Sequence, residues 1–200
     1  MLYLHFMKKK IYLTLIGGLG NQLFQYACGI NLSYELNAKL IIDDKTGFAL
    51  DNIYNRKMGL PKKLMLHKTN FFQNIFLLIL RAITKNFFRN KVYIKIFNLL
   101  IVDESNTNYY LEDFKLITSQ FKYIYLIGFF QSEKYFIEHK VKINNRILNC
   151  MKNNSKINKL TKKIDFNSLM VGIRMYEEAP KNFRQQFGGI ENFNFYNKSL

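Results

Sequence analysis

Residues 17–22 of the chain read GGLGNQ and combine glycines with two amide side chains. Glycine at 18 and 20 lets the backbone approach a bound molecule closely. The N–H groups that begin a helix offer hydrogen bonds and partial positive charge to phosphate or hydroxyl oxygens. The amides of Asn21 and Gln22 are suited to hydrogen-bonding a sugar. We therefore expect Gly18, Gly20, Asn21 and Gln22 to bind a ligand, with a tight turn without ligand as the simpler alternative.

A dinucleotide site is a second use for these glycines. The fingerprint G-x-G-x-x-G/A is followed by an acidic residue about 20 positions later. Gly18 and Gly20 fit it, and Asp43 or Asp44 lies at a suitable distance. The third position is Leu23, which is bulky where close helix–strand packing needs Gly or Ala. An NAD-type oxidoreductase therefore stays open as an alternative.

The surrounding pattern predicts the elements that would position this turn. Residues 11–16 are a continuous apolar run typical of a central parallel strand, and residues 22–36 show helical spacing of apolar side chains. A short strand at 40–42 completes a βαβ unit, so we expect an α/β fold with a parallel sheet. Further predicted elements are a strand at 122–130, a helix over 132–139 with Ser132 as N-cap, and a strand at 168–173.

Residues 71–102 interleave aromatic and aliphatic side chains with basic ones and contain no acidic residue. We expect two helices here that pack on the core, with their lysines in solvent. The alternative is that the region lies on an anionic membrane face, held by Lys85, Arg89, Lys91 and Lys95.

Charge and composition say less about function than the glycine turn does. Among 200 residues, 30 Lys and Arg against 14 Asp and Glu give a net charge of +16. Such an excess indicates an anionic partner or the coding bias of an AT-rich genome, so a nucleic-acid or membrane-surface binder is a further alternative. Cys28 and Cys150 are too few for a disulfide scaffold, which suits the cytoplasm. The first apolar run is short for a signal peptide, and no metal site is expected from His5, His67 and His139, which are isolated.

Four segments carry a resemblance to a known family. They are GGLGNQLFQYACG at 17–29, GFFQSEKYF at 128–136, VGIRMYEEAP at 171–180 and FYNKSL at 195–200. In this order they resemble the motifs of the bacterial α-1,2-fucosyltransferases, glycosyltransferase family 11. The third segment is a divergent version of that family's H-x-R-R-G-D-Y motif.

The resemblance implies a GT-B-like fold of two Rossmann-like domains. It implies inverting transfer of L-fucose from GDP-fucose to the 2-hydroxyl of a galactoside, without a metal or another cofactor. Residues 7–150 would form the acceptor-side domain, with a basic helical insertion at about 71–102. Residues 165–200 would begin the GDP-fucose-binding domain. We expect a C-terminally truncated chain that is weakly active or inactive alone, cytoplasmic, and in peripheral contact with the inner membrane face.

The third segment also implies site residues. By its position in the motif, Arg174 would contact the donor diphosphate, where a guanidinium stabilises the charge of the departing GDP. Met175 stands where the family has a second arginine. Glu177 is a candidate base for the acceptor hydroxyl and Glu178 a candidate substrate ligand, although either glutamate could instead form an ion pair with Arg174.

Overall fold

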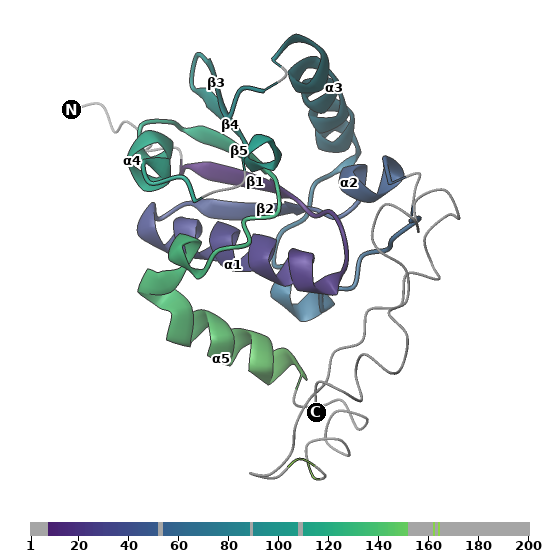
Figure 1. The fold of residues 1–200 in the computed structure, drawn as a ribbon, viewed down its shortest axis with the longest axis vertical. Coiled ribbons are helices and arrows are strands. Elements are labelled where there is room, and N and C mark those ends of the chain that lie inside the picture. The colour runs from purple at the N-terminus through teal and green to yellow at the C-terminus, as the bar shows by residue number, and fades with distance from the viewer. Residues whose placement is uncertain are drawn as a thin grey trace, which may run out of the picture.

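The computed structural model describes residues 8–51, 54–88, 90–107 and 110–151, together with positions 162 and 164. Within these residues a five-stranded sheet is covered by helices on both faces (Figure 1). Two long helices, α1 and α5, lie on one face, and α3 lies on the other (Figure 1). The expected α/β architecture is confirmed, and it is compatible with a Rossmann-like domain.

The sheet has the strand order β2-β1-β5-β4-β3. Pairing is parallel between β1 and β2, β1 and β5, and β4 and β5, whereas β3 pairs antiparallel with β4. The sheet is therefore mixed, with an antiparallel strand at one edge. The strands are β1 (Lys10–Thr14), β2 (Lys39–Asp43), β3 (Tyr93–Ile96), β4 (Leu99–Asp103) and β5 (Tyr123–Ile127).

The apolar runs form central strands because both faces of the sheet are buried. Along β1, Ile11 and Leu13 pack into the core beneath α1 and α5, while Tyr12 packs into a second core beneath α3. The same alternation in β5 sends Leu126 to the first core and Tyr125 to the second. A strand with two buried faces needs apolar residues at nearly every position, which explains the continuous runs.

The helices differ in length and in what they cover. Helix α1 follows β1 directly and packs against β1, β2 and α5. Two short helices, α2 and α4, follow β2 and precede β5 respectively. The helices are α1 (Leu19–Glu35), α2 (Thr46–Ala49), α3 (Phe71–Phe87), α4 (Phe114–Ser119) and α5 (Lys140–Met151).

The prediction of helices throughout 71–102 is wrong for its second half. Helix α3 ends at Phe87, and Asn90 then adopts a left-handed conformation with φ of 73°. The residues that follow form the β3–β4 hairpin. Its apolar residues are buried by pairing of β4 with β5, a long-range contact that local spacing does not reveal.

The predicted helix over 132–139 is also corrected. Ser132 acts as an N-cap, because its hydroxyl accepts a hydrogen bond from the N–H of Lys134. It caps a 3₁₀ turn at Glu133–Tyr135, and a second 3₁₀ turn covers Ile137–His139. The α-helix itself begins only at Lys140. The predicted strand at 168–173 lies outside the described residues, and the two-domain division stays a prediction.

Helix α2 provides a test of how tightly the connection after β2 packs on β1. A Cβ atom at Gly47 would lie 2.1 Å from the carbonyl oxygen of Leu15 and 2.6 Å from Ile16 Cγ2. We expect Gly47→Ala to lower the free energy of unfolding by about 1–3 kcal/mol, because the backbone must shift. Urea denaturation measures the change.

Gly20→Ala is the matched control, since a Cβ there meets nothing within 4 Å. Alanine is the better helix former by up to about 1 kcal/mol, so this variant should be as stable as the parent or slightly more so. Equal stability of the two variants would show that α2 does not pack as described.

Candidate functional site

The carboxyl ends of four parallel strands gather the polar segments of the described chain. Because β1, β2, β4 and β5 run in the same direction, the residues that follow them lie along one edge of the sheet. These are the glycine turn after β1, Asp43 at the end of β2, Glu104 after β4 and residues 128–132 after β5. Ligands of open α/β sheets bind at this edge.

The glycines of the turn divide into one that the fold requires and two that it does not. Gly17 has φ of +75°, and a Cβ there would lie 2.6 Å from Asn21 Nδ2. Gly18 has an ordinary extended conformation, Gly20 is helical, and a Cβ at either position meets no atom within 4 Å. Neither shape nor packing within the protein explains Gly18 and Gly20, so both leave open space for a ligand.

The first turn of α1 presents uncapped backbone N–H groups to the same space. Gly18 is the N-cap, no side chain caps the helix, and no acidic residue lies in its first turn. The free N–H groups and the positive end of the helix dipole therefore favour an electron-rich group there.

Asn21 connects this turn to the segment after β5. The Nε2 group of Gln131 donates a hydrogen bond of 2.6 Å to Asn21 Oδ1. Gln131 is exposed and Asn21 half-buried, so the pair lies at the surface of the edge. The bond joins two segments, 17–29 and 128–136, that the family resemblance had marked separately. Gln131 was not predicted as a site residue, and its only signal in the sequence was its place in the second segment.

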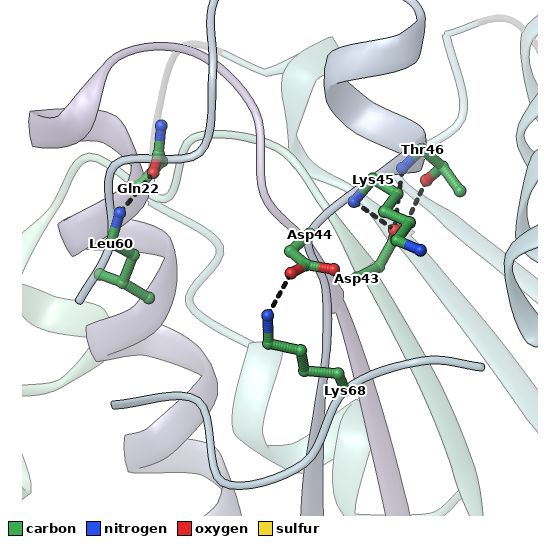
Figure 2. Close-up of polar contacts among 7 residues, drawn as sticks. All are labelled: Gln22, Asp43, Asp44, Lys45, Thr46, Leu60 and Lys68. Carbon is green, nitrogen blue, oxygen red and sulfur yellow. Dashed lines mark hydrogen bonds and ion pairs between the residues drawn. The ribbon is translucent and has the colours of Figure 1, made fainter. Parts of the chain in front are cut away.

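Gln22 has a different role from the predicted one. It is fully buried, and its Nε2 group donates to the carbonyl oxygens of Gly17 (2.8 Å) and Lys57 (3.2 Å). Its Oε1 atom accepts from the N–H groups of Gly59 (2.8 Å) and Leu60 (3.0 Å), the second of which Figure 2 shows. Both amide protons and both acceptor positions are thus occupied within the protein. Gln22 fixes the loop at residues 57–60 against the turn.

Asp43 is likewise occupied by its own protein. The carboxylate is fully buried at the end of β2. It accepts a hydrogen bond from the hydroxyl of Thr14 (2.9 Å). It also accepts from the N–H groups of Lys45 (3.1 Å) and Thr46 (2.9 Å) and from the hydroxyl of Thr46 (Figure 2). These bonds hold the start of α2 against the end of β1.

The neighbouring carboxylate is also engaged, which bears on the dinucleotide alternative. Asp44 forms an ion pair with Lys68 at 2.5 Å (Figure 2). Gly47 of α2 packs directly on the Leu15 carbonyl, in the space beyond β1. A dinucleotide site needs an acidic residue here that is available to a ribose hydroxyl. The occupied carboxylates argue against an NAD-type site at this edge.

Glu104 is a buried carboxylate that sequence reasoning missed. Its Oε2 atom accepts hydrogen bonds from the N–H groups of Phe129 (2.9 Å) and Phe130 (3.0 Å). Burial raises the pKa of Glu104, and these two bonds only partly offset that effect. Gly128 makes room for the arrangement, since a Cβ there would lie 2.7 Å from Glu104 Cβ. Because the sequence pattern was taken as helical around 71–102, the acidic end of β4 went unnoticed.

Glu104 and Gln131 border the same pocket of ≈ 430 Å³. Aromatic side chains of Tyr110, Phe129 and Tyr135 complete much of its wall. A pocket with a carboxylate, an amide and aromatic rings has the chemistry to hold a sugar ring and to accept a proton from it.

The remaining predicted site residues cannot be placed at this edge. Arg174, Glu177 and Glu178 lie outside the described residues, so their roles stay predictions.

Cys28 is buried in α1 as expected, and burial raises the pKa of its thiol. His139 is bonded to Asn31 (3.0 Å), in keeping with a histidine satisfied by its surroundings. Within the described part of the chain, no group of His, Cys, Asp and Glu is arranged to hold a metal ion.

Comparison with known proteins relates the chain to a glycosyltransferase. Over 138 residues it is 34% identical to an alpha-1,2-colitosyltransferase of Escherichia coli. The match covers 64% of this chain and 41% of that protein, so the chain spans less than half of the relative's length. No protein-family model matches the chain, and no solved structure is significantly similar to it. The chain is thus similar to a bacterial glycosyltransferase, and the match leaves the sugar open.

The two adjacent amides of the turn are expected to respond differently to substitution. Gln22→Leu removes four hydrogen bonds to backbone groups, two of them buried, so we expect a loss of roughly 3 kcal/mol in the free energy of unfolding. Asn21→Ala removes one surface hydrogen bond and should cost less than about 1 kcal/mol. Urea denaturation of both variants tests this, and a larger loss for Asn21→Ala would contradict the assigned roles.

The raised pKa of Glu104 predicts a pH dependence of stability. The folded protein binds the Glu104 proton more tightly than the unfolded chain, whose carboxyl titrates near 4.5. The contribution to stability is therefore fully present below pH 4.5 and is lost as pH rises through the raised pKa. Glu104→Gln keeps an acceptor for Phe129 and Phe130 and should abolish this decline. Denaturation midpoints measured across this range test the prediction.

Glu133→Gln supplies the control for that measurement. Glu133 is exposed and its pKa is lowered by Lys140, so its contribution has the opposite sign and is lost as pH falls. If Glu104→Gln leaves the pH profile unchanged, Glu104 is not buried as described.

Proposed function

We propose that the chain is part of an α-1,2-glycosyltransferase that moves L-fucose from GDP-fucose to the 2-hydroxyl of a galactoside, with inversion and without a metal. The proposal joins the resemblance carried by the four sequence segments to the match with a bacterial glycosyltransferase. The cytoplasm, where the nucleotide sugar is made, is the proposed location. Within the described residues, no helix is long and apolar enough to cross a membrane.

The observation that carries the proposal is the amide pair of Asn21 and Gln131. Two segments separated by 110 residues meet through this hydrogen bond at the carboxyl edge of the sheet. Beside it lie two glycines that the fold does not require and a pocket with a buried carboxylate. Amide side chains both donate and accept, which suits hydroxyl groups of a sugar. A phosphate-only or dinucleotide ligand would not explain the paired amides.

The reaction assigns a role to each charged group. The oxygen of the acceptor 2-hydroxyl bonds to the anomeric carbon of the donor sugar, while the bond from that carbon to the diphosphate breaks. The electron pair leaves with GDP, whose growing negative charge Arg174 would stabilise. The hydroxyl proton passes to a carboxylate. Glu104 is a candidate base in the described part of the chain because burial raises its pKa, and Glu177 is the candidate from the family motif.

Colitose is a second candidate for the transferred sugar. The matched relative is named for alpha-1,2 transfer of colitose, and the family resemblance is to enzymes of α-1,2 transfer of fucose. Both sources agree on the linkage and differ in the donor sugar. The acceptor side of the reaction is therefore the better supported half of the proposal.

Binding at the amide pair can be tested on the 200-residue chain. We expect lactose or another β-galactoside to shift the side-chain amide resonances of Asn21 and Gln131 in ¹⁵N spectra. Asn21→Ala should weaken the galactoside at least about fivefold, as the loss of roughly one hydrogen bond implies. NADH is the control ligand. Shifts with NADH and none with any galactoside would overturn the proposal in favour of an oxidoreductase.

Transfer itself is tested by mass spectrometry with GDP-fucose and GDP-colitose as competing donors. Because the 200 residues span less than half of the matched relative, the assay uses the protein completed with its donor-binding domain. The variants are Arg174→Ala, which should lower kcat about a hundredfold or more, and Glu104→Gln, which should lower kcat while preserving the fold. The donor that is consumed faster identifies the sugar. Galactoside binding combined with full activity of Arg174→Ala would remove Arg174 from the mechanism.

A further inference from the structure

Helix α3 carries apolar side chains on two sides. Leu77 and Leu80 are buried against the sheet in the second core. Seven large apolar residues point elsewhere and are between 37% and 80% exposed. At 100° per residue they cover an arc of about 160° on the outer side of the helix. They are Phe71, Phe72, Ile75, Phe76, Ile79, Ile83 and Phe87, which we call the outer face of α3.

Isolated exposed apolar residues are common, but a continuous stripe along a helix marks a surface that meets a partner. The expectation of a core-facing helix thus holds for Leu77 and Leu80 but does not account for the outer face. Its formation does not depend on a partner, because Asn70 and Gln73 form a reciprocal capping box at its start. The stripe is held in a fixed helical shape before anything binds it.

The charge around this helix indicates what the partner is. Residues 71–102 contain five Lys and Arg and none of the fourteen acidic residues of the chain. Lys85 of α3 and Lys91, four residues after the end of the helix, are exposed. An apolar stripe combined with basic residues and no acid is typical of a helix that lies in the interface of an anionic bilayer.

The dimensions of α3 agree with an orientation along the membrane plane. Its 17 residues extend about 25 Å. A helix that spans a bilayer needs roughly 20 apolar residues, so α3 is too short to do so. One side of the helix is also fixed to the sheet. Between α3 and the sheet lies an apolar pocket of ≈ 270 Å³, bordered by Phe76.

We propose that the outer face of α3 docks the protein on an anionic phospholipid bilayer, with Phe72, Phe76 and Ile79 in the acyl boundary and Lys85 on the headgroups. The inference does not rest on the proposed glycosyl transfer. The residues at the carboxyl edge of the sheet have no role in membrane binding. The membrane proposal and the glycosyltransferase proposal can therefore fail independently.

The test is sedimentation of the 200-residue chain with vesicles of phosphatidylcholine alone or mixed with phosphatidylglycerol. We expect binding to the mixed vesicles. The double variant Phe72→Ser, Ile79→Ser should lower the partition coefficient at least about tenfold, because two exposed apolar side chains no longer enter lipid. Lys85→Gln should lower it about fivefold, the effect of one charge near an anionic surface.

Helix α5 supplies the matched control, because it covers the opposite face of the sheet. Val141→Ser with Leu148→Ser changes two exposed apolar residues there, and Lys142→Gln changes one charge. These variants should bind vesicles like the parent. The denaturation midpoint of each variant is measured, and only variants with the midpoint of the parent are compared, so that loss of binding is not mistaken for loss of fold.

Three results would overturn the proposal. One is equal vesicle binding by the α3 and α5 variants. Another is self-association in sedimentation velocity that the α3 double variant abolishes while vesicle binding persists, which would make a second copy of the chain the occupant. The third is displacement from vesicles by RNA with no effect of the apolar substitutions, which would assign the basic surface to nucleic acid.

Discussion

Parallel pairing of β1 with β5 is the constraint on which the site depends. The two strands are adjacent in the sheet although more than 100 residues separate them, and Leu13 is in register with Leu126. Their carboxyl ends therefore meet, and the glycine turn comes to lie beside the segment after β5. Without this pairing, Asn21 and Gln131 would not form their 2.6 Å hydrogen bond. The buried apolar side chains of β1 and β5 thus determine where the polar groups of the surface meet.

Neighbouring residues of the turn serve opposite purposes. Gln22 and Gln25 both use their amides to fix backbone, Gln22 at the loop after α2 and Gln25 at both polar groups of Ile16. The two unconstrained glycines adjoin open space, and Asn21 beside them bonds to Gln131 at the surface. The backbone of the turn is fixed by internal hydrogen bonds, and the space beside the glycines is open. This arrangement favours binding, because the polar groups of the site are held in place before the ligand arrives.

The sequence predicted those parts of the fold whose signal is local. Continuous apolar runs identified β1, β2 and β5, and helical spacing identified α1, although this helix begins at Leu19 rather than at the predicted residue 22. Residues 93–102 were misassigned because a short apolar run fits a helix or a buried strand equally well, and only pairing with β5 decides between them. Gln131 and Glu104 were missed for a related reason, since each acquires its role from a segment more than 20 residues away. The burial of Gln22 depends on the loop at 57–60, whose position cannot be predicted from the periodicity of apolar residues.

The outer face of α3 and the edge of the sheet are separate surfaces of one layered domain. Helix α3 rests on a face of the sheet (Figure 1), whereas the amide pair lies where the strands end. A bilayer against α3 would therefore run beside the edge and leave it open to a polar substrate. Seven exposed apolar residues reduce solubility and promote aggregation unless something covers them. Residues 71–102 contain five basic residues and no acidic one, so an anionic surface is the cover that charge favours.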